Sequence, residues 1–182
     1  MLCFNSYLVN RNYRLYKRSE REAVPVANGD VGSMLSQKAK YALRAALMLA
    51  EGFDAGTPVA VSAIAERERI PQKFLEAILV ELRDAGILDS RRGRYGGYSL
   101  RRPPESVGFG EVIRAIDGPL ALIPCASRTQ FKACEDCTDV VTCSIRWAML
   151  NARDAIAASL DGCSLADALR RGGADQLSNG IA

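Results

Sequence analysis

Apolar residues recur at helical spacing from residue 36 onward. They form one stripe whose period predicts an amphipathic helix with a single buried face. Ser36 is expected to cap the start of this helix, because a serine hydroxyl can accept a hydrogen bond from an unpaired backbone N–H. Gly52 and the segment 56–58, Gly-Thr-Pro, predict its end. The residues of the stripe are Ala39, Ala42, Leu43, Ala46, Leu47 and Ala50.

Two shorter helices are predicted next, separated by a tight turn. The first is expected from Ser62 to Ile70, with Ile64 and Ala65 facing inward. Pro71 is expected at the first position of the next helix, where its fixed φ is favourable, and Gly86 predicts that helix's end. This helix has an apolar face and a polar face. The apolar face carries Phe74, Leu75, Ile78, Leu79 and Leu82, and the polar face carries Gln72, Lys73, Glu76 and Glu81.

A basic hairpin is predicted after these helices. Residues 87–88 and 98–100 are expected to form two short paired strands. The segment between them is rich in glycine and arginine, which is typical of a hairpin tip. It reads Arg91-Arg92-Gly93-Arg94-Tyr95-Gly96-Gly97.

The second half of the chain predicts more helices around an irregular loop. Helices are expected at Phe109–Ile116, at about Val140–Leu160 and at Leu165–Arg170, with residues 125–143 as a loop without periodicity. We divide the chain into a helix-turn-helix domain at 34–104, a cysteine loop with dimerisation helices at 105–171, and a disordered tail at 172–182. The predicted fold is mainly α, a winged helix-turn-helix with a two-stranded β-wing and a long C-terminal helix.

Residues 1–33 differ from the rest of the chain. Basic and aromatic residues alternate there without a helical period, and Pro25 and glycines interrupt any regular structure. We interpret this segment as a flexible basic extension. The favoured alternative is an upstream start codon, because a coherent domain opens at Met34.

Composition excludes several classes of protein. The net charge of the 182-residue chain is only +3, so any nucleic-acid binding must depend on how charge is distributed. Histidine is absent, and no nucleophile–base pair, phosphate loop or carboxylate dyad appears, so we predict that the chain is not an enzyme. No apolar run is long enough to span a membrane, and no secretory signal is recognisable. A cytoplasmic location is expected, where six cysteines indicate metal or redox chemistry rather than disulfides.

The order of two short helices and a basic hairpin predicts DNA binding. The third helix would present Gln72, Lys73 and Glu76 to base edges in the major groove. The hairpin, with glycines that allow close approach, would enter the minor groove. Further basic residues would contact phosphates. The predicted contact residues are Lys38, Lys40, Gln72, Lys73, Glu76, Arg91, Arg92, Gly93, Arg94 and Arg101.

Three segments together resemble the Rrf-two family of bacterial winged helix-turn-helix transcriptional regulators, over about residues 34–169. They are MLSQKAKYALRA at 34–45, Phe74-Leu75-Glu76, and RGRYGGY at 92–98. The resemblance implies a homodimer formed through the long C-terminal helix and a two-fold operator. It also implies that Lys73 and Glu76 occupy recognition-helix positions and that Arg92 is the wing arginine of the minor groove.

Four cysteines in the irregular loop predict a sensor. Cys125, Cys134, Cys137 and Cys143 follow the spacing Cys-x8-Cys-x2-Cys-x5-Cys, which supplies enough thiolates for a [2Fe–2S] or [4Fe–4S] iron–sulfur cluster or for zinc. Thiol redox switching is a further alternative. Asp136 and Asp139 lie in the same loop.

The resemblance implies an iron–sulfur cluster held by three cysteines and one further ligand. Cys137 and Cys143 match the last two cysteines, and the first is Cys134 or Cys125. Arg146 stands where some members have a histidine. An all-cysteine site, a carboxylate ligand or a different sensor chemistry would each accommodate this difference.

We therefore predict a DNA-binding regulator, expected to be a repressor, whose operator affinity depends on a cluster or on thiols in the Cys125–Cys143 loop. Its partners would be double-stranded operator DNA and a second copy of the chain, and not a membrane. The alternative is a zinc- or thiol-dependent regulator that docks an enzyme of cysteine metabolism, a mode that the family implies.

Overall fold

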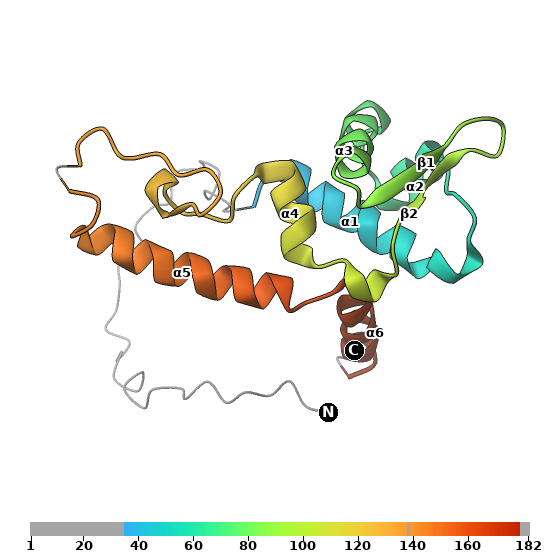
Figure 1. The fold of residues 1–182 in the computed structure, drawn as a ribbon. Helices are drawn as coiled ribbons and strands as arrows, with labels where there is room; N and C mark the ends of the chain where they lie inside the picture. The colour runs from blue at the N-terminus through green and yellow to red at the C-terminus, as the bar shows by residue number, and fades with distance from the viewer. Residues whose placement is uncertain (1–34, 138, 179–182) are drawn as a thin grey trace, which may run out of the picture. The chain divides into compact units, whose positions relative to one another are not determined.

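The computed structural model describes residues 35–137 and 139–178, with side chains described as far as residue 172. The predicted extension at 1–33 lies outside these residues. The main elements are six helices and two strands, shown in Figure 1: α1 (Gln37–Glu51), α2 (Val61–Glu68), α3 (Gln72–Asp84), β1 (Leu88–Arg91), β2 (Gly97–Leu100), α4 (Phe109–Asp117), α5 (Ser144–Asp161) and α6 (Leu165–Ser178). This order confirms the predicted mainly α fold with a two-stranded antiparallel wing.

Helix α1 begins and ends where the sequence predicts. The Ser36 hydroxyl accepts a hydrogen bond from the backbone N–H of Ala39 at 3.0 Å, and Gly52 is the C-cap. The predicted stripe faces the interior, although Leu47 is only partly buried and Ala45 and Leu49 complete the buried face. Helices α3, α4 and α6 pack against α1, which makes it the central element of the core.

The helix-turn-helix consists of α2, a three-residue turn and α3. Arg69 ends α2 in the left-handed conformation, with φ 51° and ψ 47°. Pro71 is the N-cap of α3 rather than its first helical residue, which corrects the prediction by one position. Its ψ of 123° is extended, yet its carbonyl already accepts hydrogen bonds from the N–H groups of Phe74 and Leu75, both at 3.0 Å. A proline fits this position because the residue needs no N–H donor.

The apolar face of α3 anchors it to the rest of the molecule. Leu75, Ile78, Leu79 and Leu82 are all fully buried. Phe74 is a partial exception to the predicted face, because its side chain is 42% exposed at the first turn and packs edge-to-face on Tyr41, with ring centroids 5.9 Å apart. Helices α4 and α6 contribute Val112, Ile113 and Leu165 to the same core, so the residues after 104 also build the body that carries α3.

The wing pairs β1 with β2 in one antiparallel register, from Leu88 opposite Leu100 to Arg91 opposite Gly97. Residues 92–96 form the connecting loop, so Arg91 belongs to a strand rather than to the tip. Val59 braces the hairpin from outside by exchanging two backbone hydrogen bonds with Tyr98, at 2.8 and 2.9 Å. The part of the wing next to its loop is therefore fixed by three aligned segments.

Two helix boundaries differ from the sequence-based prediction. Helix α5 begins at Ser144 rather than near Val140, because the Asp139 carboxylate binds the N–H of Val141 at 2.8 Å and the hydroxyl of Thr142 at 2.6 Å. Such local side-chain bonds favour a turn over a helix. Helix α6 continues to Ser178, so residues 172–178 of the expected disordered tail are helical. Alanine, glutamine and leucine at 174–177 are better helix formers than the preceding glycines.

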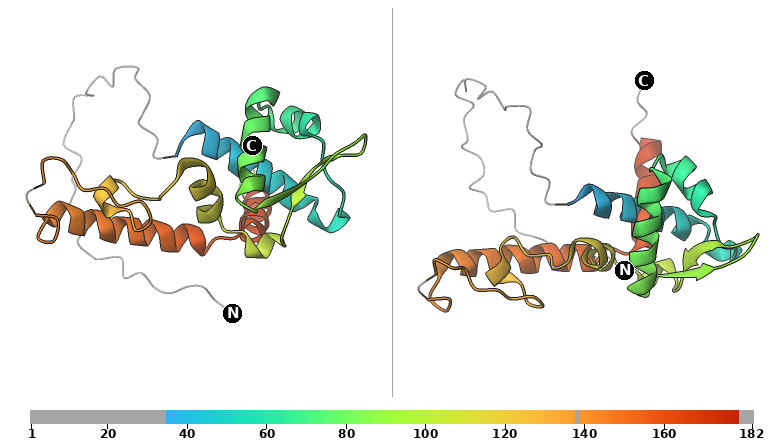
Figure 2. Two further views of the ribbon diagram at one scale, coloured as in Figure 1. Left: turned by 45° about the horizontal axis from the view of Figure 1, so that its top comes forward. Right: turned by 90° about the horizontal axis from the view of Figure 1, so that it is seen from above.

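Helix α5 lies beside the cysteine loop and α4, as Figures 1 and 2 show. None of its residues is fully buried within the described chain, although it is the longest of the described helices. None of the helices in the described residues combines the length and the hydropathy that crossing a membrane requires.

The left-handed turn at Arg69 generates a prediction about stability. Among the residues that the structure describes, Arg69 is the one non-glycine residue with positive φ. Because glycine has no Cβ to strain there, Arg69→Gly should raise the free energy of unfolding by about 1 kcal/mol. Urea denaturation monitored by circular dichroism measures this change. Ala63→Gly, on the exposed side of right-handed α2, is the matched control and should lower stability by about 0.5–1 kcal/mol. A loss of stability in Arg69→Gly would contradict the assigned backbone conformation.

Candidate nucleic-acid interface and cysteine loop

The N-terminal end of α3 presents polar side chains to solvent. Gln72, Lys73 and Glu76 are all exposed. The Gln72 amide donates a hydrogen bond to the Glu76 carboxylate at 3.0 Å, so the two lie on one helix face. The Lys73 side chain forms no ion pair with any other residue in the described part of the chain. The structure thus brings together the three predicted base-reading residues.

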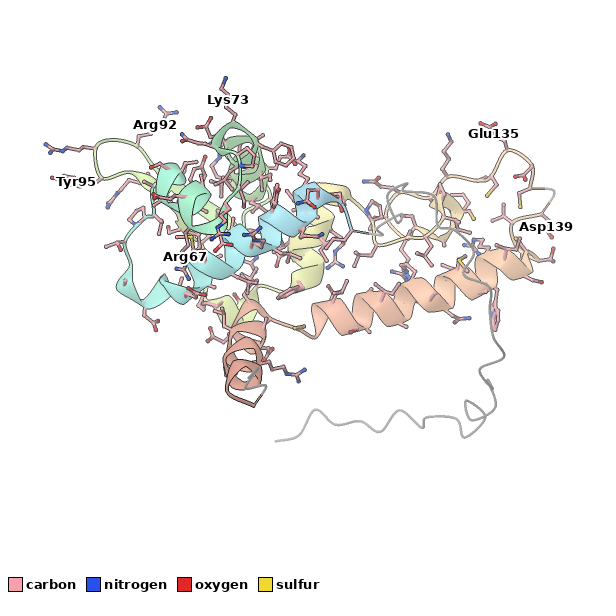
Figure 3. All side chains as sticks on the ribbon, turned by 180° about the vertical axis from the view of Figure 1, so that it is seen from behind. Arg67, Lys73, Arg92, Tyr95, Glu135 and Asp139 are labelled. Carbon is pink, nitrogen blue, oxygen red and sulfur yellow. The ribbon has the colours of Figure 1, made fainter. Side chains whose placement is uncertain are left out.

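The wing carries exposed cations on the same side of the molecule. Figure 3 shows Lys73 and Arg92 pointing out on the side where α3 begins. Arg91, Arg92 and Arg94 are exposed, and none of them forms a salt bridge within residues 35–137 and 139–178. Arg101, by contrast, has its Nε 3.7 Å from an Asp89 carboxylate oxygen, which offsets part of its charge.

Two glycines fix the shape of the wing loop. Gly93 has φ 106°, a conformation that side chains disfavour. A Cβ at Gly96 would lie 2.3 Å from the backbone oxygen of Arg91, so no other residue fits without moving the backbone. The pattern of glycines that marked a hairpin tip in the sequence therefore has a steric cause.

The two lysines predicted to contact DNA from α1 are in different environments. Lys38 binds both carboxylate oxygens of Glu81 on α3, at 2.6 and 2.7 Å. Lys40 is exposed and has no ion-pair partner among the described side chains. Lys38 therefore ties α1 to α3, a contact that its spacing in the sequence did not reveal.

Two of the four loop cysteines lie close together. Cys125 is buried in a short 3-10 helix (Pro124–Ala126), whereas Cys134 is exposed. Their Sγ atoms are 3.7 Å apart. Two thiolates on one tetrahedral metal with bonds of about 2.3 Å would be about 3.8 Å apart. The pair thus has the spacing of two ligands of a single metal, and also that of a thiol–thiol hydrogen bond.

The other two cysteines lie at the start of α5. Cys143 is the N-cap, and its Sγ accepts a hydrogen bond from the Arg146 N–H at 3.4 Å. Cys137 lies with its Sγ 3.5 Å from the Asp139 carbonyl oxygen. Within the described residues, no three Cys, Asp or Glu side chains converge tightly enough to hold a metal ion.

The thiols of the loop also influence one another's pKa values. The pKa of Cys134 is raised, mainly by its hydrogen bond to Cys125 and then by partial desolvation. Desolvation is the first cause of the raised pKa of Cys137, and the neighbouring Cys143 is the second. The hydroxyl of Thr142 lowers the pKa of Asp139. Neighbouring thiols therefore disfavour one another's thiolate forms.

Arg146 connects the two ends of the cysteine loop. Its Nε donates to the Cys125 carbonyl oxygen at 2.9 Å, and its guanidinium carbon lies 5.8 Å from the centre of the Phe131 ring. An arginine does not ligate metals, because it stays protonated. In this chain Arg146 instead holds Cys125, the first loop cysteine, beside α5, which begins directly after Cys143.

Side-chain pairs also join α4 to the start of α1 and the loop to α5. Asp117, at the end of α4, accepts hydrogen bonds from the N–H and the hydroxyl of Ser36, the cap of α1. Arg128 in the loop binds Asp154 of α5 at 2.7 Å. The sequence identified Ser36 as a cap but gave no sign of these partners, which lie far away along the chain.

Comparison with known proteins identifies the family. The Rrf2 model, described as an iron-dependent transcriptional regulator, matches residues 35–171. An rrf2-like HTH-type transcriptional regulator of Rhodobacter capsulatus is 43% identical over 141 residues, covering 76% of this chain and 94% of the relative. The HTH-type transcriptional regulator IscR of Aliivibrio salmonicida is 33% identical, covering 80% of this chain and 82% of the relative.

Solved structures of the same family have the same fold as this chain. CymR, the global cysteine regulator of Bacillus subtilis, has a TM-score of 0.58 at 29% identity, over 73% of this chain and 93% of its own. The resemblance to the Rrf-two family and the winged helix-turn-helix fold are both confirmed, and these relatives are regulators rather than enzymes.

The contacts of Arg146 generate a prediction about thiol access. Arg146→Ala removes the guanidinium that holds Cys125, so this buried thiol should be alkylated several times faster by iodoacetamide. Mass spectrometry of the metal-free protein, sampled over time, measures the rate at each cysteine. Lys132→Ala, which removes an exposed cation from the same loop, is the control. An unchanged rate at Cys125 would show that Arg146 does not restrain this part of the loop.

Proposed function

The chain belongs to the Rrf2 family of transcriptional regulators, and we propose that it represses transcription by binding a two-fold operator as a homodimer. Operator affinity is set by the state of the Cys125–Cys143 loop. The observation that carries the proposal is the shared orientation of Lys73 and Arg92 (Figure 3), which extend exposed and without salt bridges among the described residues.

The first turn of α3 reads the major groove. Gln72 is suited to the edge of adenine, and Glu76 can accept a hydrogen bond from the amino group of cytosine. These two side chains hold each other at 3.0 Å in the free protein. This bond orients the two side chains before DNA binds. On binding, contacts to base edges replace it. Lys73 extends beyond them toward guanine or a phosphate.

The wing enters the adjacent minor groove. Arg92 and Arg94 supply the cations that a narrow groove attracts, and Gly93 lets the backbone approach closely. Arg91, Arg101 and Lys40 contact phosphates. Lys38 contributes less to binding than the sequence alone suggests, because its charge is already neutralised by Glu81.

A second copy of the chain covers α5. The 18 residues of this helix include none that is fully buried in one chain, and Ile145 and Trp147 are 68% and 71% exposed. Apolar side chains of this size gain about 1.5–3 kcal/mol each on complete burial. Pairing of α5 between two copies buries them and places two recognition helices about a two-fold axis.

The four loop cysteines hold an iron–sulfur cluster in this proposal. Cys125, Cys134, Cys137 and Cys143 supply thiolates of the right type and number, and Cys125 and Cys134 already have the spacing of ligands on one metal. When bound, the cluster supplies a centre that reacts with oxidants or nitric oxide. The chain's own part is to close the loop, for which Arg146 fixes one end.

The same loop is linked to the DNA-binding helices by side chains. The segment that leads into it begins after Asp117, the last residue of α4, and Asp117 binds Ser36 at the start of α1. Lys38, two residues after Ser36, binds Glu81 of α3. A change in loop geometry that shifts Asp117 is thereby transmitted to the helix that carries the base-reading residues.

A second candidate is a zinc- or thiol-dependent regulator, which the close Cys125–Cys134 pair favours equally. In that case the chain responds by docking a partner enzyme of cysteine metabolism, a possibility raised by its similarity to a relative described as a global cysteine regulator. The metal content of the purified protein separates the two candidates.

Removing one wing arginine tests DNA binding. Arg92→Ala should weaken binding by about 1–3 kcal/mol and lower the salt dependence of log K. The probe is a DNA duplex that the wild-type protein selects from a random-sequence library, titrated by fluorescence anisotropy. Arg170→Ala removes the same charge from α6 and should bind as the wild type does. Equal affinities for Arg92→Ala and the wild type would contradict the assignment of Arg92 as a DNA contact of the wing.

Removing one thiol tests the sensor. Protein purified without oxygen should show visible absorption, with iron and sulfide in equal amounts, and Cys137→Ser should lose both. Cys163→Ser, outside the loop, should keep them. Colourless protein with one zinc per chain would support the zinc alternative, and colourless protein without metal would support thiol chemistry.

A further inference from the structure

The tip of the wing carries an aromatic side chain that the DNA-binding residues named so far leave out. Tyr95 is 82% exposed. Figure 3 shows it at the end of the hairpin, pointing away from the helices. A single exposed apolar residue is ordinary on a protein surface, so its surroundings must decide whether it has a role.

Tyr95 lies among the cations of the wing. The guanidinium carbon of Arg94 is 5.8 Å from the centre of the Tyr95 ring, which makes the two side chains one unit with a charged and an apolar part. Arg92 is exposed in the same five-residue loop. No described carboxylate forms a salt bridge with Arg92 or Arg94, so the whole tip is positive around a ring.

Backbone contacts define the loop that carries Tyr95. Strand pairing ends at Arg91 opposite Gly97, and the Gly96 N–H closes the loop on the Gly93 carbonyl oxygen at 2.9 Å. A Cβ at Gly97 would lie 2.2 Å from the backbone oxygen of Val59, so the backbone that follows the loop packs directly against Val59. Because this backbone is already ordered, less of it has to be fixed when the ring makes a contact, which lowers the entropic cost.

We propose that Tyr95 is a DNA-contact residue that packs its ring on the sugar wall of the minor groove while Arg92 and Arg94 face the groove floor and phosphates. The inference rests on the proposed function, because it assumes that the wing meets DNA. The minor groove has apolar deoxyribose walls, and wedge-like apolar side chains are common on proteins that enter it. The contact adds affinity without neutralising a phosphate.

Salt dependence distinguishes such a contact from an ionic one. Each phosphate contact contributes close to one unit to the slope of log K against log salt concentration, and a neutral ring contributes nothing. Tyr95→Ala should therefore raise Kd about tenfold, a typical effect of losing an aromatic contact to nucleic acid, and leave the slope unchanged. Arg92→Ala should reduce both affinity and slope.

The experiment titrates full-length wild type, Tyr95→Ala, Tyr95→Phe and Arg92→Ala against the library-selected duplex over a series of salt concentrations. Tyr95→Phe keeps the ring and should retain most of the affinity. Because Tyr95 is so exposed, thermal unfolding of all variants should match the wild type. A tenfold loss at constant slope, rescued by phenylalanine, supports the inference.

The other outcomes overturn it in distinguishable ways. Wild-type affinity in Tyr95→Ala together with weak binding by Arg92→Ala removes Tyr95 and leaves the proposed function intact. A lower slope in Tyr95→Ala means that the ring acts only by holding Arg94, which contradicts direct packing. If neither variant weakens binding, the wing itself does not meet DNA, and both proposals fail.

Discussion

The packing of α3 against α1 is the contact on which the rest of the structure depends. Leu75, Ile78 and Leu79 have no solvent exposure, and with Leu82 they fix the rotation of the helix about its axis. Each such side chain contributes about 2 kcal/mol by burial. Because one face is committed to the core, the opposite face must turn outward. The exposure of Gln72, Lys73 and Glu76 is therefore a consequence of apolar packing rather than of any attraction between them.

The wing follows from a different constraint, the space available to the backbone. The two strands are only four residues long each, and Val59 must bind Tyr98 for the hairpin to be held. Gly96 and Gly97 have neighbouring backbone atoms where a side chain would begin. Close backbone contact where the strands meet the loop leaves the loop thin, with arginines and one tyrosine around it. A positive, narrow projection beside a polar helix end is the shape that a DNA duplex accommodates.

The cysteine loop is built less firmly than either of these. Few of its residues are buried, among them Cys125 and Ala126. Polar contacts hold it: Arg146 of α5 binds Cys125, and Arg128 of the loop binds Asp154 of α5. Loose packing suits a segment that must change shape when thiols gain or lose a metal or are oxidised. Helix α4, which precedes the loop, is joined to the start of α1 through Asp117 and Ser36, and Lys38 joins α1 to α3, so such a change has a route to both helices.

The sequence by itself determined the features that depend on local chemistry. Helical periodicity located α1 and α3, glycines marked the wing, and cysteine spacing marked the loop. Contacts between distant residues were decided only by the tertiary structure. No local pattern shows that Lys38 meets Glu81, that Asp117 binds Ser36, or that Arg146 reaches Cys125. These depend on how the helices pack, and packing is the sum of many apolar contacts that no short segment contains. Periodicity predicts which face of a helix is buried, but only the assembled core determines which residues that face contacts.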